Sequence, residues 1–188
     1  MKRYTGFTLI ETLVAVTILT FAVVGPMFTA SRAIVAAQLA NDQITASYLA
    51  QEGIEYVREV RDNAYLDAYQ DDGPEVSTTA WGDFLASVSE CNATTNSTRA
   101  CTLDLGSGGA SSLKQCSASP CAPLRLTQLS GGNYGYTQQN SGTVTPFTRT
   151  IQVIDVSSND ERIISTVSWS FHGIPYSVTI NEHLMPWQ

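Results

Sequence analysis

Four cysteines are the residues whose type and spacing most clearly limit the chemistry of this chain. They have nine, fourteen and four residues between them and occupy positions Cys91, Cys101, Cys116 and Cys121. Structural zinc sites usually present cysteines as C-x2-C pairs, and this spacing contains none. We therefore expect two disulfide bonds. Three pairings are possible in principle, and short loops favour Cys91–Cys101 together with Cys116–Cys121.

Acidic residues and histidines supply the other candidates for metal binding or catalysis. Asp67, Asp71 and Asp72 could offer oxygen ligands to Ca²⁺, but the offsets of an EF-hand are missing, so we interpret them as a solvated acidic loop. His172 falls in a predicted turn, and His183 lies near the end of the last predicted strand. A nucleophile needs a neighbouring base and an orienting acid, and no catalytic motif such as G-x-S-x-G occurs. We expect no metal, no cofactor and no enzymatic activity.

Glu11 is the acid in the most unusual setting. No charged residue occurs from Thr12 to Ser31, which is close to the roughly 20 residues that a helix needs to cross a bilayer core. A carboxylate within such a segment costs a few kcal/mol even on the gentler insertion scales, and it is therefore a functional candidate. Gly6, the small residue best suited to cleavage, precedes the run. Cleavage there would leave the apolar segment on the mature chain, unlike cleavage of an ordinary secretory signal.

The charge distribution predicts the orientation of this segment. Lys2 and Arg3 precede it, and the positive-inside rule places them in the cytoplasm. Everything after about Arg32 then lies outside, in a compartment that permits disulfides. The formal net charge is −7, and loss of Lys2 and Arg3 would leave 17 acidic residues against 8 basic ones, a balance of −9. Phosphate contacts need clustered Lys and Arg, so we do not expect nucleic acid as a partner.

The stretch "KRYTG-FTLIE" at residues 2–11 resembles the processing site of type IV prepilins and of the pseudopilins of type II secretion systems. The resemblance implies that a membrane aspartyl peptidase, the prepilin peptidase, cuts after Gly6. It also implies that the new terminal residue, Phe7, is N-methylated, and that Glu11 guides the assembly of subunits into a filament. Residues 1–6 would then form a leader peptide.

Helical periodicity extends beyond the apolar segment. We expect a transmembrane helix over residues 7–31 and its amphipathic continuation over 32–64. The apolar stripe of that continuation consists of Leu49, Gly53, Tyr56, Val57, Val60 and Ala64. Residues 65–142 are rich in Ser, Thr, Asn and Gly, so we expect a loop-rich region stapled by disulfides. Within it, residues 81–88 favour one or two helical turns, and 124–129 a short strand.

Residues 143–188 contain three runs typical of β-strands, namely "FTRTIQVIDV", "RIISTVSWSF" and "YSVTINEHL". Short turn sequences separate them, which predicts an antiparallel meander. The half-buried positions of the last run alternate as Tyr176, Val178, Ile180 and Leu184. Glu182 is the exception to that alternation. The expected fold class is α+β, and the resemblance to pilins implies a long N-terminal transmembrane and amphipathic helix packed on a C-terminal antiparallel β-sheet.

The resemblance implies a structural role, as a subunit of a type IV pilus-like or type II secretion filament. The long cysteine-bearing insertion, and a C-terminal tail without a major-pilin disulfide loop, favour a minor pilin or minor pseudopilin. Expected partners are other pilin or pseudopilin subunits, the prepilin peptidase, the inner-membrane assembly platform and membrane lipid. The chain would wait in the inner membrane as a single-pass protein with an extracytoplasmic head, and reach the cell surface after assembly. The alternative is a membrane-anchored extracytoplasmic binding or adhesion module that enters no filament.

Overall fold

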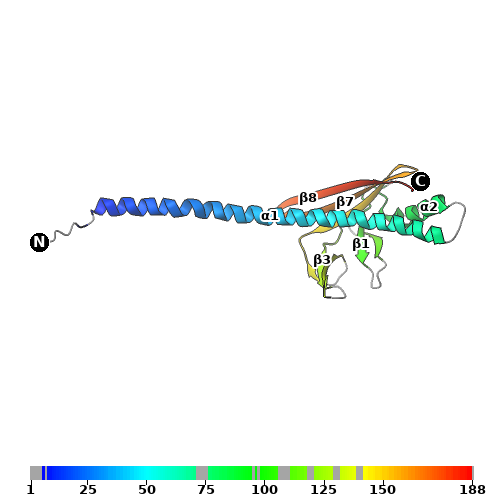
Figure 1. Ribbon diagram of the computed structural model, residues 1–188, viewed down its shortest axis with the longest axis horizontal. Coiled ribbons are helices and arrows are strands. Elements are labelled where there is room, and N and C mark those ends of the chain that lie inside the picture. The colour runs from blue at the N-terminus through cyan, green and yellow to red at the C-terminus, as the bar shows by residue number, and fades with distance from the viewer. Residues whose placement is uncertain are drawn as a thin grey trace. The chain divides into compact units, whose positions relative to one another are not determined.

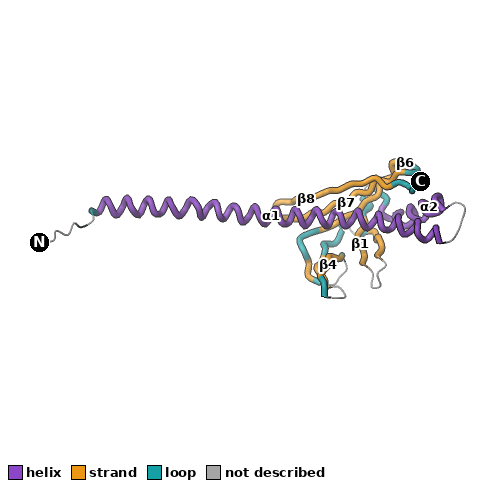
Figure 2. The backbone as a smooth tube through the Cα atoms, in the orientation of Figure 1, coloured by secondary structure: helices purple, strands orange, loops and turns teal. Residues whose placement is uncertain are grey.

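The computed structural model describes residues 6, 8–70, 76–94, 96, 98–105, 111–117, 121–128, 132–138 and 142–187. Contacts within the chain define two compact units, residues 1–42 and residues 43–188, which are described separately here. Helix α1, Leu9–Gln70, contributes to both units (Figures 1 and 2). Phe7, Asp71 and Asp72 lie outside the described residues.

In the first unit, α1 presents an apolar surface on all sides. Its large apolar side chains are exposed from Leu9 to Val35. A helix that is apolar all round requires an apolar environment, either a protein core or a membrane. The chain itself provides no core here, because none of the most apolar 18-residue stretch of the helix is buried.

In the second unit, one side of α1 is buried by the head. The buried residues are Ala46, Leu49, Ala50, Gly53, Ile54, Tyr56, Val57 and Tyr65. This confirms the predicted stripe over most of its length, and Val60 and Ala64 pack partly buried at its edge. The helix ends at Gln70, six residues beyond the predicted boundary at 64. Tyr65 explains the extension, because it is 2% exposed and stacks on Trp187 at a ring-centroid distance of 5.4 Å.

A five-stranded antiparallel sheet packs against α1, in the order β2-β1-β6-β7-β8. Its strands are β1 Cys101–Leu105, β2 Ser111–Gln115, β6 Thr148–Ser157, β7 Asp160–Phe171 and β8 Ile174–Leu184. The last three form the predicted meander, and β7 and β8 run along α1 (Figure 1). A second, three-stranded sheet, in the order β4-β3-β5, contains β3 Arg125–Gln128, β4 Tyr134–Thr137 and β5 Thr143–Val144. The described strands therefore give the expected α+β, pilin-like arrangement.

The region 65–142 contains more regular structure than the loop-rich stretch expected from its composition. It includes α2 Val76–Val88, the short 3₁₀ helix η1 Ser89–Cys91, and strands β1 to β4. Ala80, Trp81, Phe84 and Val88 lie at helical spacing on α2 and are buried. Polar composition is a poor guide here, because a few apolar residues at the right period order the segment against a core built by other elements.

Glu182, the exception in the alternation of β8, has a partner on the helix. The Arg58 guanidinium contacts the Glu182 carboxylate at 2.6 Å and the Glu55 carboxylate at 2.6 Å. Glu182 therefore lies on the helix-facing side of the strand because a cation meets it there. These carboxylates raise the pKa of Arg58, Glu182 most strongly through its hydrogen bond. The Arg58–Asp62 pair that helical spacing also allows is replaced by an Arg61–Asp62 pair at 2.8 Å.

Candidate functional sites

The processing motif lies immediately before the start of α1. Gly6 is exposed, and a Cβ built on it would meet no atom within 4 Å. The described part of the fold therefore does not require a glycine at this position. The carbonyl of Thr8 accepts hydrogen bonds from the backbone N–H groups of Glu11, at 3.0 Å, and Thr12, at 3.2 Å. The helix thus begins within a few residues of the predicted cleavage point.

Glu11 differs from the other polar residues of the apolar segment. The hydroxyls of Thr12, Thr17, Thr20 and Thr29 each donate to a backbone carbonyl three residues earlier, at 2.8–2.9 Å. Such local bonds satisfy a hydroxyl inside a helix and make it compatible with an apolar environment. The Glu11 carboxylate is exposed and receives no hydrogen bond or ion pair from any residue that the structure describes. In an apolar environment, its partner would have to come from outside the described residues.

The cysteines form two pairs, Cys91–Cys101 and Cys116–Cys121, with Cα–Cα distances of 5.3 and 5.2 Å. This is the pairing that short loops favour. Cys91 and Cys101 are fully buried, and their bond joins η1 to β1 within the core. Cys101 also pairs with Ile151 of β6, so this disulfide fixes α2 and η1 to the main sheet.

The histidines and the acidic cluster give no catalytic or metal arrangement among the described residues. His183 Nδ1 lies 2.8 Å from Asp160 Oδ1, and His172 is in the turn between β7 and β8 with φ 52°. No group of three or more His, Cys, Asp or Glu residues in the described part of the chain could hold a metal ion. Asp67 is exposed near the end of α1.

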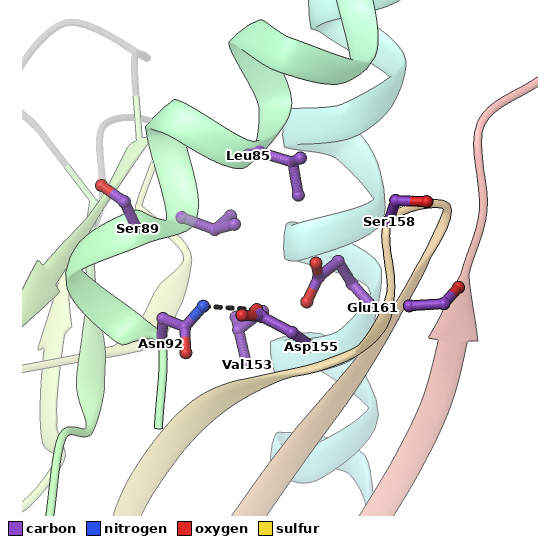
Figure 3. Close-up of a pocket in the computed structure, with 9 residues that line it drawn as sticks. Leu85, Ser89, Asn92, Val153, Asp155, Ser158 and Glu161 are labelled. Carbon is purple, nitrogen blue, oxygen red and sulfur yellow. Dashed lines mark hydrogen bonds between the residues drawn. The ribbon is translucent and has the colours of Figure 1, made fainter. Parts of the chain in front are cut away.

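Sequence reasoning missed an acidic pocket at the tip of the β6–β7 hairpin. Asp155 and Glu161 lie directly opposite each other on the two strands. They line a pocket of about 350 Å³ whose apolar walls are Leu85, Val88 and Val153. Figure 3 shows the two carboxyl groups pointing toward the same space below Leu85. The signal was present in the alternation of β7, because Ile163, Ser165, Val167 and Trp169 face inward and Glu161 continues that face.

Glu161 is 3% exposed, and its Oε2 has no hydrogen-bond partner among the described residues. Burial, with smaller contributions from Asp155 and Asp160, raises the pKa of Glu161 to about 7. Asp155 is exposed and accepts a hydrogen bond from the Asn92 side-chain amide. The indole N–H of Trp81 donates to the Ser158 carbonyl at 3.0 Å and holds the hairpin turn beside α2.

Arg149 is the second buried charge on the same face of the sheet. Its guanidinium Nη1 donates to the Leu49 carbonyl at 3.1 Å and to Glu52 at 2.6 Å, both on α1. Gly53 lies beside this contact, where a Cβ would stand 2.5 Å from Ser165 Oγ and 3.4 Å from Arg149 Cδ. The glycine therefore permits the close approach of α1 to the sheet. Burial lowers the pKa of Arg149, and Glu52 opposes that effect.

Comparison with known proteins gives one finding, at the N-terminus. Residues 1–25 match the family model described as "Prokaryotic N-terminal methylation motif". Comparisons with curated proteins and with solved structures found no match. The match covers the processing motif, Glu11 and the first part of the apolar helix, and that helix suggests membrane anchoring. The chain therefore carries a prepilin-type N-terminal signal, the motif of processed subunits of the type IV pilin and pseudopilin kind.

Proposed function

We propose that this chain is a minor subunit, a minor pilin or minor pseudopilin, of a type IV pilus-like or type II secretion filament. The peptidase would cut between Gly6 and Phe7, and the apolar helix would hold the product in the inner membrane until assembly. The role is structural rather than enzymatic. The observation that carries the proposal is Glu11, a carboxylate without a partner among the described residues. The threonine hydroxyls that follow it in the apolar segment, those of Thr12, Thr17, Thr20 and Thr29, are bonded internally.

Cleavage would create the cation that Glu11 lacks. The new α-amine of Phe7 lies close to Glu11 in sequence, and an adjacent subunit carries an identical amine. In an apolar environment the two charges attract more strongly than in water, but desolvation offsets much of that gain. The value of the pair is therefore in specificity. Apolar side chains alone would let neighbouring helices slide, whereas one amine–carboxylate pair fixes their axial offset.

The minor role is supported by the head. The region between α1 and β6 carries both disulfides, and the hairpin of β3 and β4 belongs to a second sheet. The β3–β4 hairpin lies outside the five-stranded sheet and is an addition to the helix-and-sheet arrangement. A subunit present in few copies can carry such additions, because it does not have to repeat along the whole filament.

The test is incorporation of Glu11→Gln into filaments in the native cell. Intact mass should show that parent and variant both lack residues 1–6 and carry the added mass of one methyl group. The variant should remain in the membrane fraction, and its content in sheared filaments should fall about tenfold or more, equivalent to about 1.4 kcal/mol. Thr17→Val is the matched control, because it removes an internally bonded polar group from the same apolar segment. It should assemble normally.

Two outcomes would contradict the proposal. A mature chain that retains Lys2 and Arg3 would show that the motif is not processed. Normal cleavage, with neither parent nor Thr17→Val present in filaments, would favour the membrane-anchored binding or adhesion module instead.

A further inference from the structure

We propose that the acidic pocket binds an alkylammonium group, whose charge lies between Asp155 and Glu161 and whose carbon chain packs on Leu85, Val88 and Val153. The proposal concerns a binding site in the head and does not depend on the role assigned to the N-terminal segment. It rests on strand register, on burial and on the balance of donors and acceptors in the pocket.

Register brings the two carboxyl groups together. Asp155 of β6 and Glu161 of β7 are directly opposed, with a shift in register between Asp155 and Ser157. Directly opposed residues of an antiparallel pair have Cβ atoms about 4.5–5.5 Å apart, and like charges at such positions are destabilising. Two acids therefore face each other at a position where an ordinary hairpin would place opposite charges or apolar residues.

The pocket has an excess of hydrogen-bond acceptors. Glu161 is 3% exposed and its Oε2 has no partner among the residues described. The Asn92 amide donates to Asp155 and supplies nothing to Glu161. A buried carboxylate without donors is strongly disfavoured, so the site needs either a proton on Glu161 or a cation between the two acids.

The shape and the number of ligands favour an ammonium group over a metal ion. Two carboxylates are present, and no set of three acidic or histidine ligands exists in the described part of the chain. Ca²⁺ takes six to eight oxygen ligands, whereas an ammonium group has three donors. A volume of about 350 Å³ with aliphatic walls exceeds what an ion requires. It suits a charged head on a carbon stem, which packs on apolar surface while its charge meets an acid.

Binding should depend on pH in a defined direction. An ammonium group binds the ionised form of Glu161, whose pKa burial and Asp155 raise to about 7. Affinity should therefore increase about tenfold between pH 6 and pH 8, following the ionised fraction of one acid. Asp160 also acts on Glu161, and it is paired with His183 of β8. The variant His183→Gln should keep the pH dependence if Glu161 is responsible for it.

The experiment uses the full chain in detergent micelles, with n-butylammonium as the probe. The thermal midpoint should rise saturably, by about 2–4 °C at roughly five times the dissociation constant, as expected for ligand linkage in a chain of this size. Sodium at equal ionic strength and neutral n-butanol should give no such rise. Glu161→Gln and Asp155→Asn should each abolish it. Asp83→Asn, which removes an exposed charge from α2 outside the pocket, should retain it.

Three results would overturn the proposal. The first is an equal shift in the parent and in both pocket variants. The second is an equal effect of sodium or butanol. The third is stabilisation by micromolar Ca²⁺ that the pocket variants lose, with no effect of the amine, which would identify a divalent-cation site.

The ammonium group could come from a lysine side chain of another protein or from a free amine, and crosslinking separates these sources. Carbodiimide treatment of cells joins a carboxyl group to an amine in contact with it. An amide bond from Asp155 or Glu161 to a lysine of another chain would assign the group to a protein. Butylammonium binding without that crosslink would assign it to a free amine.

Discussion

Arg149 and Glu161 are both buried on the inward face of the same sheet, but their surroundings differ. Arg149 meets the Glu52 carboxylate and the Leu49 carbonyl, both from α1. Glu161 meets Leu85 and Val88 from α2, and another acid, Asp155, from β6. The arginine has a counter-charge, although its Nε has no hydrogen-bond partner among the described residues, whereas the glutamate faces a like charge.

The comparison shows that the energetic cost of burying a charge depends on which helix packs against it. At Arg149 that helix is α1, and at Glu161 it is α2. Burying any ion costs several kcal/mol, and a counter-charge with good geometry offsets that cost. At Arg149 the Glu52 carboxylate offsets part of that cost, although burial still lowers the pKa of Arg149, and the pair holds α1 in register with the sheet. At Glu161 the structure describes no counter-charge, so burial raises the pKa of the carboxyl group and the site remains available for a cation. The same face of the sheet thus carries an ion-paired charge at Arg149 and an acid with a raised pKa at Glu161.

The largest effect should follow from removing the compensation at Arg149. Glu52→Ala would leave a fully buried guanidinium with the Leu49 carbonyl as its described acceptor. We expect the free energy of unfolding to fall by about 2–3 kcal/mol. This is less than the roughly 3–5 kcal/mol for breaking a fully buried pair, because the Glu52 side chain is 47% exposed. Chemical denaturation of the head, followed by tryptophan fluorescence, measures it.

The control for this prediction is Glu59→Ala, an exposed acid on the same helix. It should change the stability by less than about 0.5 kcal/mol. In the double variant Glu52→Ala with Arg149→Met, most of the loss should be recovered, because no buried charge remains. An equal loss in the single and double variants would contradict the assigned role of the pair.

Removing the charge of Glu161 should increase the stability of the head, whereas removing the partner of Arg149 decreases it. Its pKa of about 7 in the folded chain lies above the reference value of 4.5, so the folded state keeps this proton longer than the unfolded state. The contribution to stability is complete below about pH 4.5 and is lost as the pH rises through 7. Glu161→Gln should remove this loss and stabilise the head at pH 8. We expect about 2 kcal/mol, less than the roughly 3 kcal/mol of the full pKa difference, because solvent reaches the open side of the pocket and screens the charge.

Unfolding free energies of parent and Glu161→Gln, measured between pH 5 and pH 8.5, test this prediction. The two curves should converge at low pH and separate above pH 7. Asp83→Asn serves as the control for a general change in net charge. Parallel curves for parent and Glu161→Gln would show that Glu161 ionises normally.

A smaller effect is expected where α1 approaches the sheet. Gly53→Ala gains about 1 kcal/mol of helix propensity, but its Cβ would stand 2.5 Å from Ser165 Oγ. Overpacking of a core typically costs about 1–3 kcal/mol, so we expect a net loss of about 1 kcal/mol. In a Ser165→Ala background that loss should disappear. A stabilising effect of Gly53→Ala alone would show that the space between α1 and Ser165 accommodates a Cβ at position 53.

Periodicity predicted the elements well, and it predicted the contacts between them poorly. The stripe from Leu49 to Val57 and the three C-terminal strands follow from spacing alone, since each period matches a buried face. The spacing of apolar residues indicates helical turns over residues 81–88, within α2. It does not show what holds them in place, because Trp81 and Phe84 depend on a core that distant strands supply. Alternation indicates that Glu161 faces inward, but only the register of the hairpin places Asp155 opposite it.

The contacts between α1 and the sheet also determine when the head can complete its folding during biogenesis. Arg149 and its acceptor Leu49 are 100 residues apart, and Arg58 and Glu182 are 124 residues apart. The helix leaves the ribosome long before the strands that cover its stripe. Until β6 to β8 follow, the stripe has no native partner, and contacts of such separation form late. The head therefore depends on its last strands, and the interval before their arrival is when a chaperone or protease would meet the exposed helix.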